Sequence, residues 1–279
     1  MSAATLRHRG PMERVVVFAI LGVAILLMIA PFLYMVSLSL QSDADLFSGV
    51  PVIIPTSWQF TNYVDIWQKA PFGRFVLNSF IIAGSITLLH LIFDPLIGYV
   101  FAKMQFPGKS ILFGTLLSTL MLPFFIRMIP LYILTAQMGW LNTYQGLIMP
   151  FAMSAYGIFL MRQFITPIPN ELIDAARIDG AGDIGIYVRI ILPQVRPALA
   201  TVGLLTFIFQ LNEFLWPLIV VQTTEMRPIT TGLTLFNQEF FVAWNLTATG
   251  GVILFLPSLL LFLFMQRYFI RSVMLSGMK

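Results

Sequence analysis

The sequence predicts an all-α integral membrane protein with six transmembrane helices, and three observations support this fold class. The chain has 279 residues, of which 58% are hydrophobic and 10% are charged, and its mean hydropathy is +0.87. A soluble domain has about 25% charged residues, so this chain could not cover its surface with polar side chains. Its apolar residues lie in long runs rather than in the alternating segments of about ten residues that form membrane β-barrels. Since lipid satisfies no backbone hydrogen bonds, such runs predict helices.

Six apolar runs of suitable length follow one another along the chain. Each is close to the roughly 20 residues that a helix needs to cross a bilayer. The first run is too long for the apolar region of a signal peptide, and we expect it to be retained as a span. The length favours a single transmembrane domain over residues 1–279. The predicted spans are about 15–40, 75–101, 111–136, 144–161, 198–222 and 245–266.

The Lys and Arg residues predict the orientation, because cytoplasmic loops are enriched in them. Twelve of the sixteen fall on one side of the predicted spans. Three fall on the other side, at Lys69, Arg74 and Arg227, and Arg127 lies within a span. We therefore expect both termini and the segment 162–197 to be cytoplasmic.

The composition excludes disulfides and does not favour a metal site or a nucleic-acid-binding surface. The chain has no cysteine, and its net charge of +4 is explained as a topology signal rather than a nucleic-acid patch. His90 and Asp94 lie four residues apart on one helical face, but two ligands do not make a metal site. We expect them to pack or hydrogen-bond near the kink at Pro95. We expect no metal and no cofactor.

The predicted cytoplasmic segment contains two helices joined by a glycine turn. "NELIDAARIDGAGDIGIYVRIILPQVRPALA" covers residues 170–200. Asn170 is the expected N-cap of the first helix, Gly180 the residue that ends it, and Asp183 the cap of the second helix, which Pro193 ends. Gly180, Gly182 and Gly185 also spell G-x-G-x-x-G, but no strand precedes them, so a dinucleotide site is not supported. The first helix should present an apolar surface formed by Leu172, Ala175, Ala176 and Ile178.

Two isolated charges fall inside predicted spans, where ionisable groups are functional candidates. Arg127 is 16 residues into the third span and Glu213 is 15 residues into the fifth, or ~24 Å and ~22 Å along straight helices. Similar depths suggest three interpretations. The residues form an ion pair, within this chain or with a partner; or both line a translocation pathway; or Arg127 extends to the lipid headgroups.

Aromatic residues are concentrated in two of the predicted outer connections. Two interpretations remain open: an aromatic belt at the membrane interface, or a docking surface for an external partner. The residues are Trp58, Phe60, Tyr63, Trp67, Phe236, Phe240, Phe241 and Trp244.

The motif "DAARIDGAGDIGIYVRIILP" resembles the EAA loop of permease subunits of binding-protein-dependent ATP-binding-cassette importers. The family pattern is matched by Asp174-Ala175-Ala176, by Gly180, and by Ile190 with Leu192-Pro193, where Asp174 replaces the usual Glu. Other segments, such as "GWLNTYQGLI" and "LNEFLWPLIV", resemble the smaller permease subunit of the maltose-type, carbohydrate branch. The resemblance extends over nearly the whole chain.

The resemblance implies a type I ABC importer permease fold and a place in the plasma (inner) membrane of a bacterium or archaeon. It implies a permease that forms half of a pathway for a sugar, polyol or glycerol phosphate solute. The partners would be a second homologous permease, two ATPase subunits that use ATP and Mg²⁺, an extracytoplasmic solute-binding protein, and membrane lipid. The residues that would contact the ATPase are Glu171, Asp174, Ala175, Ala176, Arg177, Asp179, Gly180, Leu192 and Pro193, and Asn212 joins Arg127 and Glu213 as a candidate pathway residue.

The chain has no P-loop of the form G-x-x-x-x-G-K-[ST], so we expect it to be a transport subunit and not itself an enzyme. The alternative function is an ion-coupled secondary transporter. That class would need a chain of intramembrane carboxylates and an internal repeat. The sequence shows neither.

Overall fold

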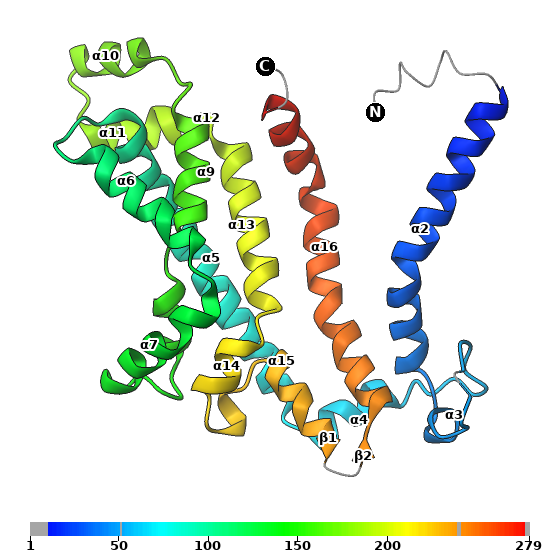
Figure 1. Cartoon of the computed structure of the whole chain (residues 1–279). Helices are drawn as coiled ribbons and strands as arrows, with labels where there is room; N and C mark the ends of the chain where they lie inside the picture. Colours follow the sequence, from blue (N-terminus) through cyan, green and yellow to red (C-terminus); the bar gives the residue numbers. More distant parts are fainter. Residues whose placement is uncertain (1–10, 51, 239–240, 277–279) are drawn as a thin grey trace. The chain divides into compact units, whose positions relative to one another are not determined.

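The computed structural model describes residues 11–50, 52–238 and 241–276, and almost all regular structure in them is helical (Figure 1). The chain divides into two compact units. The first comprises Met1–Ala70 and Phe236–Ile253, and the second comprises Pro71–Leu235 and Leu254–Lys279.

The first unit is built around the long helix α2, Pro11–Ser39. The span Val15–Ser39 is apolar, and its most apolar 18-residue window contains no buried residue, as expected for a helix surrounded by lipid or by another subunit. Shorter elements follow at its C-terminal end: α3 (Asp43–Leu46), α4 (Asn62–Lys69), the two-residue strands β1 (Asn237–Gln238) and β2 (Phe241–Val242), and the first part of α16 (Trp244–Ser276). Buried Asn62 donates to the carbonyl oxygens of Ser39 and Gln41, which fixes α4 against the end of α2.

The second unit is organised by α5, Phe72–Lys103, which packs along α9 and α13 (Figure 1). Gly98 permits the close approach of α9, since a Cβ there would lie 2.9 Å from Cβ of Met161. The other elements are α6 (Lys109–Ser118), η1 (Thr119–Met121), α7 (Phe124–Gln137), α8 (Tyr144–Ile148), η2 (Met149–Phe151), α9 (Ala155–Ile165), α10 (Asn170–Ile178), α11 (Asp183–Ile186), η3 (Tyr187–Ile191), α12 (Leu192–Gln194), α13 (Arg196–Leu211), α14 (Leu215–Val220), η4 (Thr224–Met226), α15 (Ile229–Gly232), η5 (Leu233–Phe236) and the remainder of α16.

Three helices of the described chain are long and apolar enough to cross a membrane, and the number rises to six if each of three bent helix pairs is one span. The predicted run 111–136 is divided: the chain bends by 104° between η1 and α7. The bend falls at Leu122–Pro123, because a residue that precedes proline is disfavoured in helical geometry. The run 144–161 is also divided, by a 41° bend before α9.

The fifth predicted run, 198–222, does not form one helix either. Helix α13 ends at Leu211, and the separate short helix α14 begins at Leu215. At the other end of α13, the bent pair that joins Asp183–Gln194 to Arg196–Leu211 has an angle of 79° at Val195. A straight helical rise therefore does not give the depth of residues after Leu122 or Leu211.

The outer aromatic residues have different surroundings. Trp58, Phe60, Trp67 and Trp244 are exposed, whereas Phe236 is buried. Phe240 and the side chain of Phe241 lie outside what the structure describes. Both interpretations of the exposed aromatics, belt and docking surface, stay open.

Candidate functional site

The best-defined candidate site is the segment between α9 and α13, and it is built around α10. The helix begins at Asn170, with Pro169 in the N-cap position. The prediction that Asn170 is the N-cap is therefore wrong by one residue. Pro169 sets an extended entry into the helix (φ −57°, ψ 136°), so the side chain of Asn170 is free to make another contact.

Gly180 ends α10 as predicted. It has φ +84°, which L side chains rarely adopt. The amide of Ala181 donates to the carbonyl of Ala176 (2.9 Å), and the amide of Gly180 donates to that of Arg177 (3.0 Å). These two bonds form a Schellman motif, which satisfies the last carbonyls of the helix and reverses the chain.

The two faces of α10 have different roles. Leu172, Ala175 and Ile178, spaced by three, are exposed, and Ile178 is 87% exposed. Ile173 is buried, and Ala176 packs with it against the hydrophobic cluster at the ends of α5, α9 and α13. Of the four residues expected on the outer surface, Ala176 thus faces partly inward. The outer face offers apolar side chains for a partner.

The second helix starts and ends differently from the prediction. Gly182 holds the N-cap position of α11. Asp183 accepts a hydrogen bond from Arg177 at 3.0 Å, and this bond raises the pKa of the Arg177 guanidinium. Pro193 lies in the last turn of the continuous helical stretch Asp183–Gln194, directly after its π-helical part, and the stretch ends one residue later than predicted. The break comes at Val195, after a π-helical stretch over Tyr187–Ile191.

Lys103 anchors this segment to α5, a role that the sequence did not indicate. Its Nζ donates to the carbonyl oxygens of Thr166 (3.0 Å) and Ile168 and to Oδ1 of Asn170 (2.9 Å). One ammonium therefore caps the end of α9 and holds the start of α10. The ring of Tyr99 lies 5.5 Å from that of Tyr187, which adds an aromatic contact beneath the loop.

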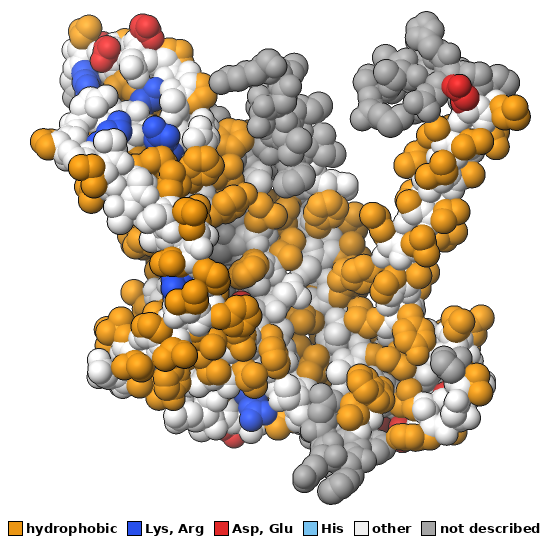
Figure 2. Space-filling view, viewed as in Figure 1, with side chains coloured by type: hydrophobic (Ala, Val, Ile, Leu, Met, Phe, Trp, Pro, Cys, Tyr) orange, Lys and Arg blue, Asp and Glu red, His pale blue; other side chains and the backbone are white. Residues whose placement is uncertain are grey.

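Charged side chains gather over the end of the second unit that carries α10 and α11 (Figure 2). Glu171, Asp174 and Asp179 are all exposed there. Leu192 and Pro193 are half-buried, and Leu192 packs on the same cluster as Ala176. The nine predicted coupling residues thus form two groups. Six are exposed on α10 and its turn, and the other three, Ala176, Leu192 and Pro193, are partly buried.

The three candidate pathway residues are not brought together as an ion pair. Arg127 lies on α7, is exposed, and forms no salt bridge with any described residue. Oε1 of Glu213 instead accepts hydrogen bonds from the amides of Leu215 (3.0 Å) and Trp216 (3.2 Å), so it caps α14. Of the open interpretations, an ion pair within this chain is therefore not formed among the described residues, while a pair with a partner subunit and a role in the pathway stay predictions. The equal-depth argument failed because it assumed straight helices, and the bend before Pro123 and the helix end at Leu211 remove that assumption.

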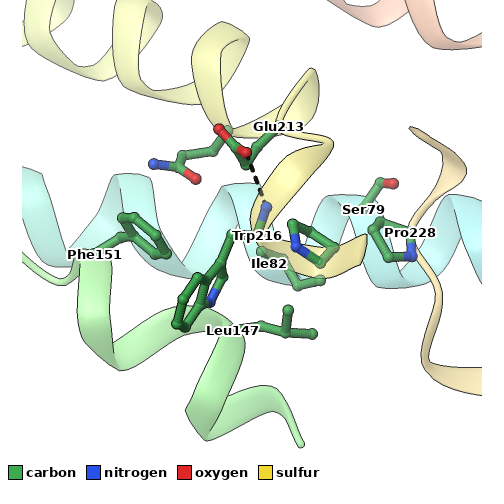
Figure 3. Close-up of a pocket in the computed structure, with 9 residues that line it drawn as sticks. Ser79, Ile82, Leu147, Phe151, Glu213, Trp216 and Pro228 are labelled. Atoms are coloured by element: carbon green, nitrogen blue, oxygen red, sulfur yellow. Dashed lines mark hydrogen bonds between the residues drawn. The ribbon is translucent and has the colours of Figure 1, made fainter. Parts of the chain in front are cut away.

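Glu213 lines a small pocket with Ser79, Leu147, Trp216 and Pro228 (Figure 3). The pocket holds no more than about one water molecule, so it is too small for a solute. The indole Nε1 of Trp216 donates to the carbonyl of Gly146 at 2.9 Å. Neighbouring Asn212 is exposed and donates to the carbonyl of Ile208 (2.7 Å) at the end of α13. This region of the structure joins α13, α14 and α8.

His90 and Asp94 form a buried polar network, in agreement with the prediction of a hydrogen-bonding role. Nδ1 of His90 lies 2.9 Å from Oδ2 of Asp94, and Nε2 lies 2.8 Å from the carbonyl oxygen of Phe151. Oδ1 of Asp94 accepts the amide of Ser154 at 3.1 Å, at the break before α9. A Cβ at Gly157 would lie 1.8 Å from Oδ2 of Asp94, so only glycine leaves room for the carboxylate. Three elements therefore meet at this pair. Among the described residues, no three His, Cys, Asp or Glu side chains form a possible metal site.

Known proteins share this architecture and much of the sequence. Residues 94–275 match the family described as binding-protein-dependent transport system inner membrane component. The chain is 33% identical to the arabinooligosaccharides transport system permease protein AraQ of Halalkalibacterium halodurans, over 93% of this chain and 95% of that protein. It is also 33% identical to the sn-glycerol-3-phosphate transport system permease protein UgpE of Pectobacterium atrosepticum, over 83% and 85%.

A solved structure agrees with these sequence matches. A chain in the crystal structure of a bacterial ABC transporter involved in the import of the acidic polysaccharide alginate covers 94% of this chain, with 99% of its own length matched, a TM-score of 0.82 and 25% identity. The all-helical fold is thus that of a type I ABC importer permease. The chain belongs to the family of inner-membrane components of binding-protein-dependent transport systems.

Proposed function

We propose that this chain is one of two permease subunits that form the translocation pathway of an ATP-driven importer for a sugar, or a related polyol or glycerol phosphate. Relatives that share about a third of their residues with it are named for arabino-oligosaccharide and sn-glycerol-3-phosphate transport. The alginate importer supports the same general class of polyhydroxylated solutes. Membership of the family argues against the alternative of an ion-coupled secondary transporter.

The observation that carries the proposal is the capped helix α10 with its exposed apolar face. Leu172, Ala175 and Ile178 point away from the cluster that holds the loop, and the Schellman turn at Gly180 fixes their position. A rigid, protruding helix transmits force between subunits better than a solvated loop would. We assign its outer face to the contact with a cytoplasmic ATPase subunit, and we assign Glu171, Asp174, Arg177 and Asp179 to the polar rim of that contact.

The assembly that this role requires contains a second, homologous permease, two ATPase subunits and an extracytoplasmic solute-binding protein. ATP and Mg²⁺ would be bound by the ATPase subunits, and the chain needs no cofactor of its own. Six spans with both termini in the cytoplasm follow if each bent pair crosses once, and the distribution of Lys and Arg supports this orientation. We place the protein in the inner membrane of a bacterium or archaeon. In this arrangement Arg127, Asn212 and Glu213 remain candidates for residues near the pathway.

Reconstitution tests the proposal. The chain is co-expressed with its partner permease and ATPase, placed in proteoliposomes that contain ATP, and supplied externally with the solute-binding protein and a radiolabelled solute. The first solutes to test are arabino-oligosaccharides and sn-glycerol 3-phosphate. We expect uptake that requires both ATP and the binding protein. Uptake driven by a proton or sodium gradient without ATP would contradict it.

A further inference from the structure

A pocket lined by none of the proposed coupling or pathway residues opens where α5 ends and α6 begins. It has a volume of about 470 Å³. Two of the residues around it are cations, Lys109 and Arg162, and none is acidic. The complete lining is Phe101, Gln105, Phe106, Gly108, Lys109, Ser110, Phe113, Gly114 and Arg162.

The two cations are held in place by neutral groups, which leaves their charges uncompensated. Nζ of Lys109 donates to the carbonyl of Met104 at 2.7 Å. Nε of Arg162 donates to the carbonyl of Phe101 at 3.2 Å, and its guanidinium carbon lies 4.4 Å from the centre of the Phe113 ring. Neither cation forms a salt bridge with a described residue. The remaining N–H groups of both side chains are therefore available to an anion.

The N-terminus of α6 adds to this positive environment. Gly108 occupies the N-cap position and provides no side-chain cap. The amide of Lys109 donates to the carbonyl of Phe106 at 3.4 Å, whereas the amides of Ser110 and Ile111 in the first turn of this ten-residue helix donate to no backbone carbonyl among the described residues. Free amides at a helix N-terminus favour negative charge.

The floor and the surroundings of the pocket are apolar. The rings of Phe101 and Phe106 lie 6.0 Å apart, and those of Phe101 and Phe113 lie 5.2 Å apart. No residue of α6 is buried, and Ile111 and Leu112 just beyond the pocket are 73% and 55% exposed. Because α5 is a candidate membrane span that ends at Lys103, we place the pocket at the depth of the lipid headgroups. A soluble anion would not need an apolar surface beside its binding pocket, whereas the acyl chains of a lipid would.

We propose that this pocket binds the phosphate of an anionic phospholipid, such as phosphatidylglycerol, with its acyl chains along the exposed face of α6. Lys109 and Arg162 donate to the phosphate oxygens, and the aromatic floor receives the glycerol and the start of the chains. Basic pockets between spans near a membrane surface are suited to such headgroups. The site depends on membrane residence and not on the identity of the solute, so it would stand even if the assigned solute class were wrong.

Native mass spectrometry of the assembled, detergent-purified transporter tests this site. Phosphatidylglycerol and phosphatidylcholine are titrated separately, and the bound lipid is counted for each complex. We expect one tight phosphatidylglycerol that phosphatidylcholine does not replace. Lys109→Gln with Arg162→Gln should weaken it by about thirtyfold, from about fivefold for each lost cation near the surface. Lys69→Gln with Arg74→Gln removes the same charge away from the pocket and should change nothing.

Further variants keep the test decisive. If the double variant does not assemble, Lys109→Gln alone should weaken phosphatidylglycerol by about fivefold, and Arg162→Lys, which keeps the charge, should weaken it less. Glycerophosphoglycerol, the headgroup without acyl chains, should not displace the lipid. Equal binding of both lipids, unchanged affinity in the Lys109 variant, or displacement by the soluble headgroup would overturn the proposal. So would a loss of ATPase subunits from the Lys109 variant with its lipid retained, which would assign the pocket to a protein contact.

Discussion

At the scale of single residues, the buried pair His90–Asp94 joins α5 to the segment before α9. Nε2 of His90 faces the carbonyl oxygen of Phe151 and must therefore carry a hydrogen. Nδ1 lies 2.9 Å from a carboxylate oxygen of Asp94. This arrangement is compatible with the apolar interior, where an unpaired charge would be costly.

We predict that this network depends on hydrogen bonding rather than on charge. Asn at position 94 can accept the amide of Ser154 and donate to neutral His90, so Asp94→Asn should retain near-normal stability. Asp94→Ala leaves His90 and the Ser154 amide unsatisfied and should cost about 2–5 kcal/mol. His90→Leu should be similarly harmful, and the double variant less harmful than the sum of the two single ones. Thermal unfolding of the purified complex measures these differences, and a strongly unstable Asp94→Asn would show that the charge is needed.

Glu213 leads to a second residue-scale prediction, which concerns capping. Glu213→Gln retains an oxygen for the amides of Leu215 and Trp216 and should leave the yield of folded complex unchanged. Glu213→Leu removes the cap and should cost about 1 kcal/mol. Because Arg127 forms no salt bridge with Glu213, the stability losses of Arg127→Met and Glu213→Leu should add to within about 0.5 kcal/mol. A coupling well above that value, measured by a double-mutant cycle, would mean that the two side chains interact in the assembled protein.

At the scale of elements, the helical segments could largely be located from the sequence, but their bends could not. Apolar length identified α2, α5 and α16, whose ends differ from the predicted runs mainly by extension. The Schellman turn at Gly180 was predictable, because a glycine that follows a helix commonly adopts the left-handed conformation that ends it. The division at Leu122 was signalled by Pro123, yet prolines also occur inside the continuous helices of this chain. Only packing decides between a kink and a break.

The anchoring by Lys103 and the pairing of Arg177 with Asp183 had no local signal. Lys103 reaches residues more than 60 positions away, and two of its three partners are backbone carbonyls that any sequence would provide. From the sequence, Asp183 could equally have capped the second helix. In the fold it accepts a hydrogen bond from Arg177 instead.

Helix α10 and its turn carry the sharpest element-scale prediction, because the chain provides a matched control. A Cβ added at Gly180 or at Gly182 would meet no neighbouring atom within 4 Å, but only Gly180 has positive φ. Gly180→Val should therefore strain the turn by about 1–2 kcal/mol and shift the outer face of α10. Solute-stimulated ATPase of the reconstituted complex should fall several-fold, while insertion and docking of the solute-binding protein persist. Gly182→Val should retain coupling, and equal effects of the two substitutions would remove the turn geometry as the cause.

At the scale of the whole molecule, the proposed function implies one division of labour. In that proposal the apolar helices span the membrane. The segment between α9 and α13 provides the surface that contacts the ATPase subunit and moves with it during ATP hydrolysis. Composition predicted the first part, since no soluble fold fits a chain with 10% charged residues. The motif around Gly180 predicted the second part through its resemblance to a family, and the contacts that support the loop became visible only in the fold.

Site-specific photocrosslinking at α10 tests this central claim most directly. Benzoylphenylalanine is placed at Ile178, which is 87% exposed on the outer face of α10, and at Ile53, which is 72% exposed in the first unit, as a control. After irradiation of the intact transporter in membranes, we predict an adduct between the Ile178 position and the ATPase subunit, identified by mass spectrometry, and none from Ile53. A complex that retains its ATPase but gives no ATPase adduct at Ile178, or gives the same adduct at Ile53, would contradict the assignment of α10 as the coupling surface.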